Sequence, residues 1–291
     1  MNTVIKNSAL EVSVSDIGAE LMSIRHNGRE YLWQGAENVW DDRSPVLFPI
    51  CGRLKDARYT YKGKTYEMGI HGFLWKSKME ISAKGEDFVT YTLKDSEESR
   101  SIYPFAFEAS VTYKLVKNRM EFTFALKNTG DEKLYFSHGY HPGFILPLCE
   151  EDDFSDCYVE FTEKCSPKLI EMSNTTYLVT GNTPDFPLED DKILRLTHKL
   201  FDERSVFLKD MSRELTLRGK NTDRSVTVSF PECSVLGFWQ AAGCEAEYLC
   251  VEPWNGLPSY DGVDEDITTK KASLELEPGA DYSNTIYVTL N

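Results

Sequence analysis

Apolar and polar residues alternate with a period of two from one end of the chain to the other. The clearest runs are rich in β-branched and aromatic residues, and Gly, Asn, Asp or Pro separates them. These runs are LEVSVSDIG (10–18), FVTYTLKD (88–95), ASVTYKLVK (109–117), MEFTFALKN (120–128), SVTVSF (225–230) and TIYVTL (285–290). The pattern predicts many strands, each with one face turned toward a core.

Short polar segments between the runs predict turns. KNR (117–119) and NTGDEK (128–133) are expected to connect antiparallel strands, and YTYKGKTYEM (59–68) is expected to form a hairpin with Lys62-Gly63-Lys64 at its tip. Helical periodicity is nearly absent, although HKLFDERS (198–205) predicts a short helical turn. The chain is therefore predicted to be all-β, a large antiparallel β-sandwich or barrel with long connecting loops.

Residues 145–190 are richer in Asp, Glu, Ser, Thr and Pro, which would allow a domain boundary there. Strand patterns of the same character resume after this segment, so a single domain over residues 1–291 is the simpler prediction.

The composition narrows the possible partners. The formal net charge is −15, with 47 acidic against 32 basic residues, so nucleic-acid binding is not expected. No run approaches the roughly 18 apolar residues of a membrane helix, and the first residues lack a signal-peptide pattern. Seven cysteines, an odd number without C-x-x-C spacing, suit free thiols packed as small apolar groups. A cytoplasmic protein without membrane attachment is the expectation.

Two of the five histidines lie in FSHGYHPGF (136–144). On an extended chain His138 and His141 point to opposite faces, and the glycines and the proline around them disfavour a helix. They are therefore not expected to share a metal ion, and no cysteine cluster completes a zinc site. At least one of them could be a core histidine bonded to backbone groups.

Two further segments carry candidate chemistry. His71, in GIHGFLW (69–75), stands between glycines and aromatic residues, which suits a sugar ring or a tight turn equally. Glu252, in VEPWNG, follows an apolar run and is expected at the end of a buried strand, where desolvation would raise its pKa; a salt-bridged structural glutamate is the alternative. Arg53, in CGRLKD, is the candidate cation, or else a structural ion-pair partner.

Taken together and in this order, PVLFPICGRLKD, IHGF, GYHPGF and CVEPWNG resemble the aldose 1-epimerase (galactose mutarotase) family, and within it the shorter branch of LacX-type proteins. The resemblance spans residues 45 to 256. It implies a β-supersandwich with an open cleft, no cofactor, and interconversion of the α and β anomers of a free aldose. IHGF and EPWNG depart from the better-known galactose mutarotases, so galactose is not assumed as the substrate.

The resemblance also implies residue roles. Glu252 matches the general base that takes the proton of the C1 hydroxyl, and His141 the general acid that protonates the ring oxygen. His141 is expected to be held by a turn that Pro142 and Gly143 impose. His71 matches a histidine that hydrogen-bonds the sugar near that oxygen. Arg53 matches an arginine that binds ring hydroxyls, and Asp202 an aspartate on the far side of the ring. Trp254 is a candidate wall residue, and His138 is left as a structural neighbour.

Two other functions fit the same residues. A non-catalytic sugar-binding or sensing protein would not need both Glu252 and His141, because binding alone requires no acid–base pair. A mutarotase of a phosphorylated hexose would need basic residues beyond Arg53, for which Lys55 and Arg58 are the nearest candidates. A glycosidase is disfavoured, since it would need two convergent carboxylates. The physiological sugar and the oligomeric state are not predicted.

Overall fold

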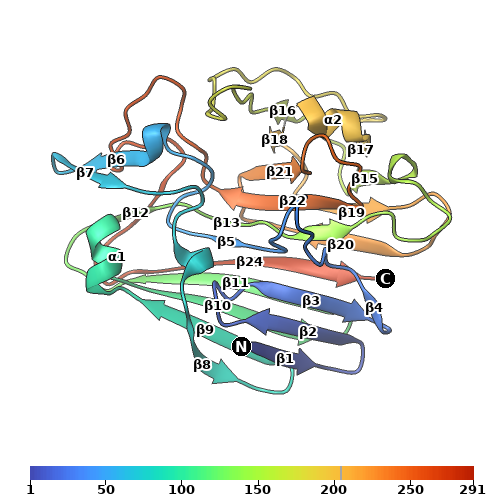
Figure 1. The fold of residues 1–291 in the computed structure, drawn as a ribbon, viewed down its shortest axis with the longest axis horizontal. Coiled ribbons are helices and arrows are strands. Elements are labelled where there is room, and N and C mark those ends of the chain that lie inside the picture. Colours follow the sequence, from blue (N-terminus) through green and yellow to red (C-terminus); the bar gives the residue numbers. More distant parts are fainter. Residues whose placement is uncertain (204) are drawn as a thin grey trace.

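The computed structural model describes residues 1–203 and 205–291, and strands dominate it (Figure 1). The largest sheet has nine strands in the order β17-β15-β19-β20-β24-β11-β10-β9-β8, paired antiparallel throughout. Its strands are β8 (Glu80–Lys84), β9 (Phe88–Lys94), β10 (Phe107–Val116), β11 (Arg119–Asn128), β15 (Tyr158–Phe161), β17 (Ile193–Arg195), β19 (Glu214–Arg218), β20 (Ser225–Ser229) and β24 (Asp281–Leu290).

A second sheet of seven strands lies above strands β24, β11, β10, β9 and β8 of the first sheet in Figure 1. Its order is β16-β18-β21-β22-β13-β5, and β14 pairs with β22 beside β13. Its strands are β5 (Val46–Leu47), β13 (His138–Tyr140), β14 (Gly143–Ile145), β16 (Lys168–Leu169), β18 (Val206–Lys209), β21 (Val235–Trp239) and β22 (Tyr248–Asn255).

The remaining elements are small. A four-stranded sheet comprises β1 (Asn2–Lys6), β2 (Leu10–Ser15), β3 (Leu21–His26) and β4 (Arg29–Glu30), and two-stranded pairs are formed by β6 (Arg58–Tyr61) with β7 (Lys64–Glu67) and β12 (Leu134–Phe136) with β23 (Leu274–Leu276). The helices are α1 (Glu97–Ile102) and α2 (His198–Glu203), with 3-10 turns at Lys55–Ala57, Leu74–Lys76 and Phe154–Asp156. No helix in the described part of the chain is long and apolar enough to cross a membrane.

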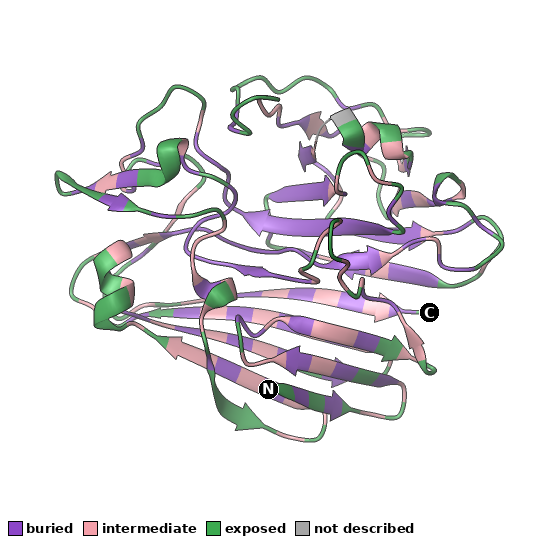
Figure 2. Ribbon diagram, viewed as in Figure 1, coloured by how far each residue is buried: buried purple, intermediate pink, exposed green. Residues whose placement is uncertain are grey.

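The sheets form a sandwich because one face of the nine-stranded sheet is apolar. On β11, Phe122 stacks on Tyr140 of β13 with ring centroids 4.0 Å apart, so the seven-stranded sheet covers this part of the face. On β10, the Tyr113 hydroxyl donates to the backbone oxygen of Ala19, between β2 and β3, so the four-stranded sheet covers the neighbouring part. Burial alternates along β10 and β11, as the period-two pattern predicted (Figure 2).

Strand β22 differs from these strands because all eight of its residues are buried (Figure 2). Leu249 and Val251 belong to the main apolar core. Of the alternate side chains, Glu252 and Trp254 line a cavity on the other face of the seven-stranded sheet. A strand buried on both faces carries no clear alternation, which is why its first half, YLCV, reads as an apolar run.

The all-β antiparallel sandwich predicted from the sequence is confirmed. The predicted hairpin is formed by β6 and β7. The helical turn predicted over residues 198–205 corresponds to α2, and residue 204 of that range lies outside the described residues. One turn prediction was wrong: NTGDEK leads from β11 into β12, which pairs with β23 rather than with β11. Helix α1 was not predicted; Ser96 and Ser99 form a capping box at its start, in a segment too short for a helical period. The single-domain expectation stays a prediction.

Candidate active site

A cavity of about 600 Å³ opens on the face of the seven-stranded sheet that points away from the core. Its floor comes from β18, β21 and β22, and loops from other parts of the chain form its walls. All six residues that the sequence singled out for a site line this one cavity: Arg53, His71, His141, Asp202, Glu252 and Trp254. Segments as far apart in the chain as Arg53 and Trp254 therefore meet at one place.

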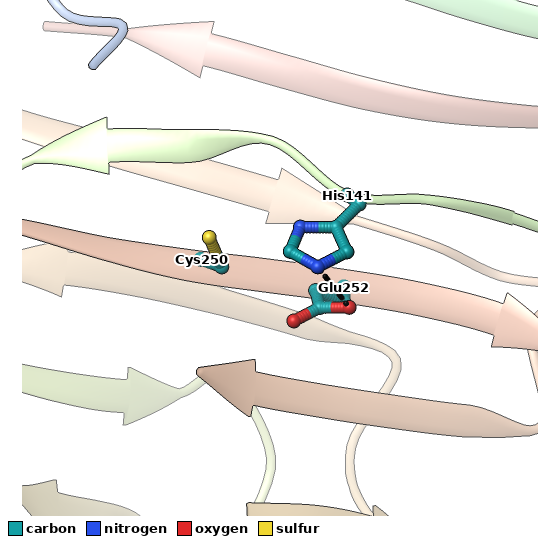
Figure 3. Close-up of side chains that lie close together, drawn as sticks. All are labelled: His141, Cys250 and Glu252. Atoms are coloured by element: carbon teal, nitrogen blue, oxygen red, sulfur yellow. Dashed lines mark ion pairs between the residues drawn. The ribbon is translucent and has the colours of Figure 1, made fainter. Parts of the chain in front are cut away.

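Strand pairing places His141 beside Glu252. Gly139 pairs with Trp254, and Gly143 pairs with Cys250, in a single unbroken register. His141 lies midway between the two glycines and hence opposite Glu252. The Nε2 atom of His141 is 3.2 Å from Oε2 of Glu252 (Figure 3).

Glycines make room around this pair. A Cβ atom at Gly139 would lie 2.4 Å from Cδ1 of Trp254, and one at Gly143 would lie 2.8 Å from Cζ3 of Trp40. The two indoles therefore occupy space on either side of His141 that side chains would otherwise fill. This explains the G-x-H-x-G spacing in GYHPG: glycine at each second position keeps the cavity face clear on both sides of the imidazole.

Two expectations about this segment were wrong in detail. Glu252 lies inside β22, not at its end, because β22 continues through Pro253 to Asn255. Pro142 and Gly143 do not impose a turn, since β14 continues the pairing with β22 in the register of β13. The Pro142 backbone oxygen even accepts a hydrogen bond from the Val251 amide at 3.0 Å. Proline lacks only the donor, so its carbonyl can still join the ladder.

Burial dominates the electrostatics of the His141–Glu252 pair. Glu252 is 1% exposed and His141 is 8% exposed. Desolvation raises the pKa of the Glu252 carboxyl well above its usual value and lowers the pKa of His141 to about 4. Both shifts favour the neutral side chains, so burial favours the form of the pair in which the carboxyl group of Glu252 is protonated and His141 is not.

Several polar atoms at the cavity lack partners. Both carboxyl oxygens of Glu252, Nδ1 of His141 and Nε1 of Trp254 are buried without a hydrogen bond among the described residues. The His141–Glu252 contact is short, but its angles do not make a hydrogen bond. Buried polar groups are costly when unpartnered. Such a cluster facing a cavity indicates a polar ligand that would supply the missing partners.

His71 is held in one tautomer. The Gly52 amide donates a hydrogen bond to its Nδ1 at 3.1 Å, so in neutral His71 the proton is on Nε2. Burial, and then the charges of His141 and Arg53, lower the pKa of His71 well below its usual value. Its backbone has φ of 63°, a conformation rare outside glycine. The ring stands edge-on to that of His141, with centroids 5.6 Å apart, and offers an N–H donor.

The other three predicted residues lie around the pair. Arg53 is exposed, has no ion-pair partner among the described residues, and lies over the ring of Tyr177 at 5.7 Å. Asp202 is exposed, and its Oδ1 accepts a hydrogen bond from the Gly243 amide at 2.7 Å. Trp254 is buried, with its ring 5.8 Å from that of His71. All three residues lie at the cavity, and the roles that the resemblance implies for them stay predictions.

His138 lies on the opposite side of the sheet. Its ring stacks on Phe124 at 4.8 Å between centroids, and its Nε2 is 2.8 Å from the Tyr282 hydroxyl. His138 and His141 therefore point to opposite faces, as their spacing predicted, and His138 belongs to the core.

The group that could hold a metal ion is a different one from the histidine pair. In the described part of the chain, ligand atoms of His141, Cys250 and Glu252 lie within 4.8 Å of one another (Figure 3). A thiol binds metal as thiolate. Burial raises the pKa of Cys250 well above its usual value, and Cys250 does not line the cavity. The trio fits an acid–base pair with an adjacent protonated thiol better than a metal centre.

Sequence reasoning missed other lining residues. They include three tryptophans, a carboxylate and an exposed tyrosine: Trp40, Trp75, Trp239, Asp42 and Tyr177. Trp40 and Trp239 flank His141, with ring centroids at 5.2 Å and 5.7 Å. Trp239 pairs with Cys250, so its side chain lies on the same face of the sheet as that of Glu252. The period of two along each strand would give this result if the register of the two strands were known. Trp40 and Tyr177 lie in loops, where no period applies.

Comparison with known proteins gives the same family throughout. The model of the family described as aldose 1-epimerase matches residues 1–275. Protein LacX (chromosomal) of Lactococcus lactis subsp. lactis is 32% identical over 266 residues, which cover 88% of each chain. A galactose mutarotase related enzyme from Lactobacillus acidophilus, solved by X-ray crystallography, is also 32% identical, with a TM-score of 0.95 over 100% of this chain and 97% of that one.

More distant structures extend the likeness. A galactose mutarotase-like protein from Lactobacillus casei superposes with a TM-score of 0.94 at 28% identity, over the full length of both chains. The galactose 1-epimerase of Lactobacillus acidophilus NCFM has a TM-score of 0.74 at 13% identity, over 100% of this chain and 94% of that one, and shows the shared fold alone. With the family model and the LacX relative in agreement, the chain belongs to the aldose 1-epimerase family.

Proposed function

We propose that the protein interconverts the α and β anomers of an unphosphorylated aldohexose, with Glu252 and His141 as the proton-transfer pair. The observation that carries the proposal is the buried contact of 3.2 Å between Nε2 of His141 and Oε2 of Glu252, in a cavity where both carboxyl oxygens lack partners. Ring opening needs a proton removed from the C1 hydroxyl and one delivered to the ring oxygen. Because both oxygens are bonded to C1, the two groups that serve them must be neighbours.

The pair needs one proton in total. With Glu252 ionised and His141 protonated, Glu252 takes the C1 hydroxyl proton while His141 gives its proton to the ring oxygen; the C1–O5 bond breaks and C1 becomes a carbonyl carbon. The pair is then Glu252 protonated and His141 neutral, the form that burial favours. After rotation about C1–C2, the reverse transfers close the ring as the other anomer. Proton transfer alone completes the cycle.

The surrounding residues suit substrate binding. The Nε2–H of His71 would donate to the sugar near the ring oxygen, and its neutral state follows from its lowered pKa. Arg53 and Asp202 would bind hydroxyls, and Trp254 with Trp40 would pack against the apolar C–H faces of the ring.

The charges at the cavity favour an unphosphorylated sugar. Lys55 pairs with Asp264 at 2.7 Å, and Arg58 is 3.3 Å from Asp56; neither basic residue lines the cavity. Arg53 is accompanied there by three carboxyl groups, those of Asp42, Asp202 and Glu252. Because burial favours the neutral form of Glu252, a phosphate dianion would meet one cation, Arg53, and the two aspartates Asp42 and Asp202.

Two-dimensional exchange NMR of anomers tests the proposal directly. The purified protein is added to glucose, galactose and glucose 6-phosphate, and the α–β exchange rate is compared with the spontaneous rate in the same buffer. We expect acceleration for at least one free hexose and a smaller effect on the phosphate ester. Binding of free hexoses without any acceleration would instead support a sugar-binding or sensing protein and refute the mutarotase proposal.

A further inference from the structure

The cavity is larger than one hexose needs. A hexose has about twelve non-hydrogen atoms, and even at the roughly 30 Å³ that each water molecule occupies in the liquid it would fill no more than about 360 Å³. The cavity measures about 600 Å³. If one ring occupies the space beside Glu252, a substantial volume is left for another group.

Burial indicates where this extra space lies. Glu252 and His141 are buried, His71 is partly exposed, and Arg53 and Tyr177 are exposed. The His71 ring is 5.6 Å from the His141 ring, Arg53 is close enough to His71 to help lower its pKa, and Arg53 lies over Tyr177. These contacts form a path from the buried pair to the mouth of the cavity, and Tyr177 is at its outer end.

Tyr177 presents an aromatic surface there. Tyr177 is 61% exposed. The guanidinium carbon of Arg53 lies over one face of its ring, 5.7 Å from the ring centroid. Tyr177 and Arg53 both line the cavity, and the high exposure of Tyr177 leaves the face of its ring opposite Arg53 open. An exposed aromatic face offers a flat apolar surface on which the C–H face of a sugar ring can pack.

The position of Tyr177 is fixed by hydrogen bonds. Its amide donates to the Ser173 backbone oxygen at 2.9 Å, and its φ of 57° is rare for a bulky residue. Val179 donates to the backbone oxygen of Ser259, and Ser259 donates to that of Arg53, each at 2.9 Å. The Tyr177 and Arg53 segments are thus joined through Ser259, which fixes the backbone of Tyr177 relative to that of Arg53.

Polar groups suited to hydroxyls accompany the ring. Asn174 is exposed, lines the cavity, and makes no side-chain hydrogen bond to another described residue. The guanidinium of Arg53 likewise has no carboxylate partner in the described chain. An aromatic face flanked by a free amide and a free guanidinium matches the surface of a pyranose ring, whose faces are apolar and whose edge carries hydroxyls.

We propose that Tyr177, Arg53 and Asn174 form a second sugar subsite, which holds the non-reducing ring of a disaccharide while its reducing ring occupies the Glu252–His141 end. The proposal rests on the proposed function for the identity of the inner site. It adds a binding contribution from the outer ring: reducing disaccharides bind more tightly than monosaccharides, and Tyr177 carries part of the difference.

Methyl glycosides test the subsite independently of catalysis, because their anomeric centre is blocked. Dissociation constants are measured by calorimetry for methyl glucoside, methyl maltoside and methyl cellobioside, with wild type, Tyr177→Ala and Tyr177→Phe. We expect wild type to bind at least one disaccharide glycoside about tenfold more tightly than the monosaccharide glycoside. Tyr177→Ala should remove most of that ratio, and Tyr177→Phe, which keeps the ring, should retain it.

Equal binding of mono- and disaccharide glycosides by wild type, or no measurable binding of either, would overturn the subsite. So would a Tyr177→Ala variant that weakens both by the same factor. Since the first comparison uses wild type alone, it stands even if a variant fails to fold. An anion explanation is tested with glucose 6-phosphate: tighter binding than either disaccharide, lost in Arg53→Gln, would assign the outer end to a phosphate and refute the second ring. Anomer exchange of maltose and cellobiose is measured separately, so loss of catalysis is distinguished from loss of the subsite.

Discussion

The two faces of the sheet at β13 and β22 each carry a histidine, but the surroundings of the two histidines differ. On the core face, the His138 ring stacks on Phe124 and its Nε2 lies 2.8 Å from the Tyr282 hydroxyl. On the cavity face, three residues further along, His141 meets Glu252 at 3.2 Å without a proper hydrogen bond. The core face partners its imidazole with the protein's own groups, whereas the cavity face leaves the Glu252 carboxyl group and Nδ1 of His141 without hydrogen bonds to the described residues.

The difference comes from what lies above each face. Phe124 and Tyr282 belong to the opposing sheet, which closes over His138. Above His141 there is a cavity, with glycines at the flanking positions 139 and 143. A titratable residue in a strand therefore becomes a candidate for chemistry only when the sheet has no partner layer over it.

The largest expected effect separates the two histidines. His141→Gln should lower kcat for anomer exchange about a hundredfold or more, because it removes a proton-transfer group. His138→Gln should instead lower the free energy of unfolding by about 1–3 kcal/mol, through lost stacking and an altered buried hydrogen bond, with kcat close to wild type. Exchange NMR and urea denaturation of both variants check this. A His138 variant that folds but loses as much activity as His141→Gln would break the comparison.

The next largest effect is the dependence of kcat/KM on pH. On each limb of the profile, where one group is in its inactive protonation state, kcat/KM should fall by up to tenfold per pH unit. The pair works with one proton. It gains a second as pH falls through the pKa of His141, which burial lowers to about 4, and it loses its only proton as pH rises through the raised pKa of Glu252. We expect a bell with its acid limb below pH 6.5, the ordinary value for histidine.

The profile is measured by polarimetry, with a thermal denaturation curve at each pH to exclude unfolding. An acid limb at pH 6.5 or above would mean that His141 titrates like a solvated imidazole, contrary to its burial. Loss of the bell in favour of a single limb would mean that only one of the two groups transfers protons.

A smaller effect concerns stability. The pKa of Glu252 is higher folded than unfolded, so from its unfolded value of 4.5 upward the folded protein holds a proton that the unfolded chain has lost. Stability from this group is thus present below pH 4.5 and declines as pH rises. The Glu252→Gln variant has no carboxyl group at this position, so its stability does not show this decline with pH. Above pH 6.5, where His141 is neutral in both states, its stability relative to wild type should increase by up to about 1.4 kcal/mol per pH unit until Glu252 ionises.

Denaturation at pH 7 and pH 8 measures this gain, and Glu11→Gln, on an exposed position of β2, serves as the matched control. A Glu252→Gln variant that gains nothing over the control between the two pH values would show that Glu252 is already solvated and ionised in the folded protein.

The sequence predicted the sandwich because half-buried strands such as β10 and β11 record their exposure at every second residue. It could not predict that Glu252 lies inside a strand, since β22 is buried on both faces and shows no alternation. The site residues came from a resemblance carried by four short motifs. The contact between His141 and Glu252 depends on the pairing of strands more than a hundred residues apart, which no local pattern encodes.

The loop residues at the cavity could not be predicted from local sequence either. Trp40 packs beside His141, and Tyr177 lies at the cavity mouth, but neither belongs to a named strand or helix. Their positions follow from the loop backbones and from tertiary contacts such as that of Arg53 over Tyr177. Local sequence predicts the strands that carry this site well, because their side chains alternate with a period of two. It predicts the loops that surround the site poorly, because their side chains follow no period.

The central claim is that the unpartnered carboxyl group of Glu252 transfers a proton to and from the sugar. The most direct test is exchange NMR of glucose anomers with wild type and Glu252→Gln, alongside calorimetric binding of methyl glucoside to both. The amide keeps the size of the side chain but cannot accept the C1 hydroxyl proton, so we predict an exchange rate reduced about a hundredfold or more with the dissociation constant changed less than about tenfold. Exchange at near wild-type rates by a folded Glu252→Gln protein would contradict the account.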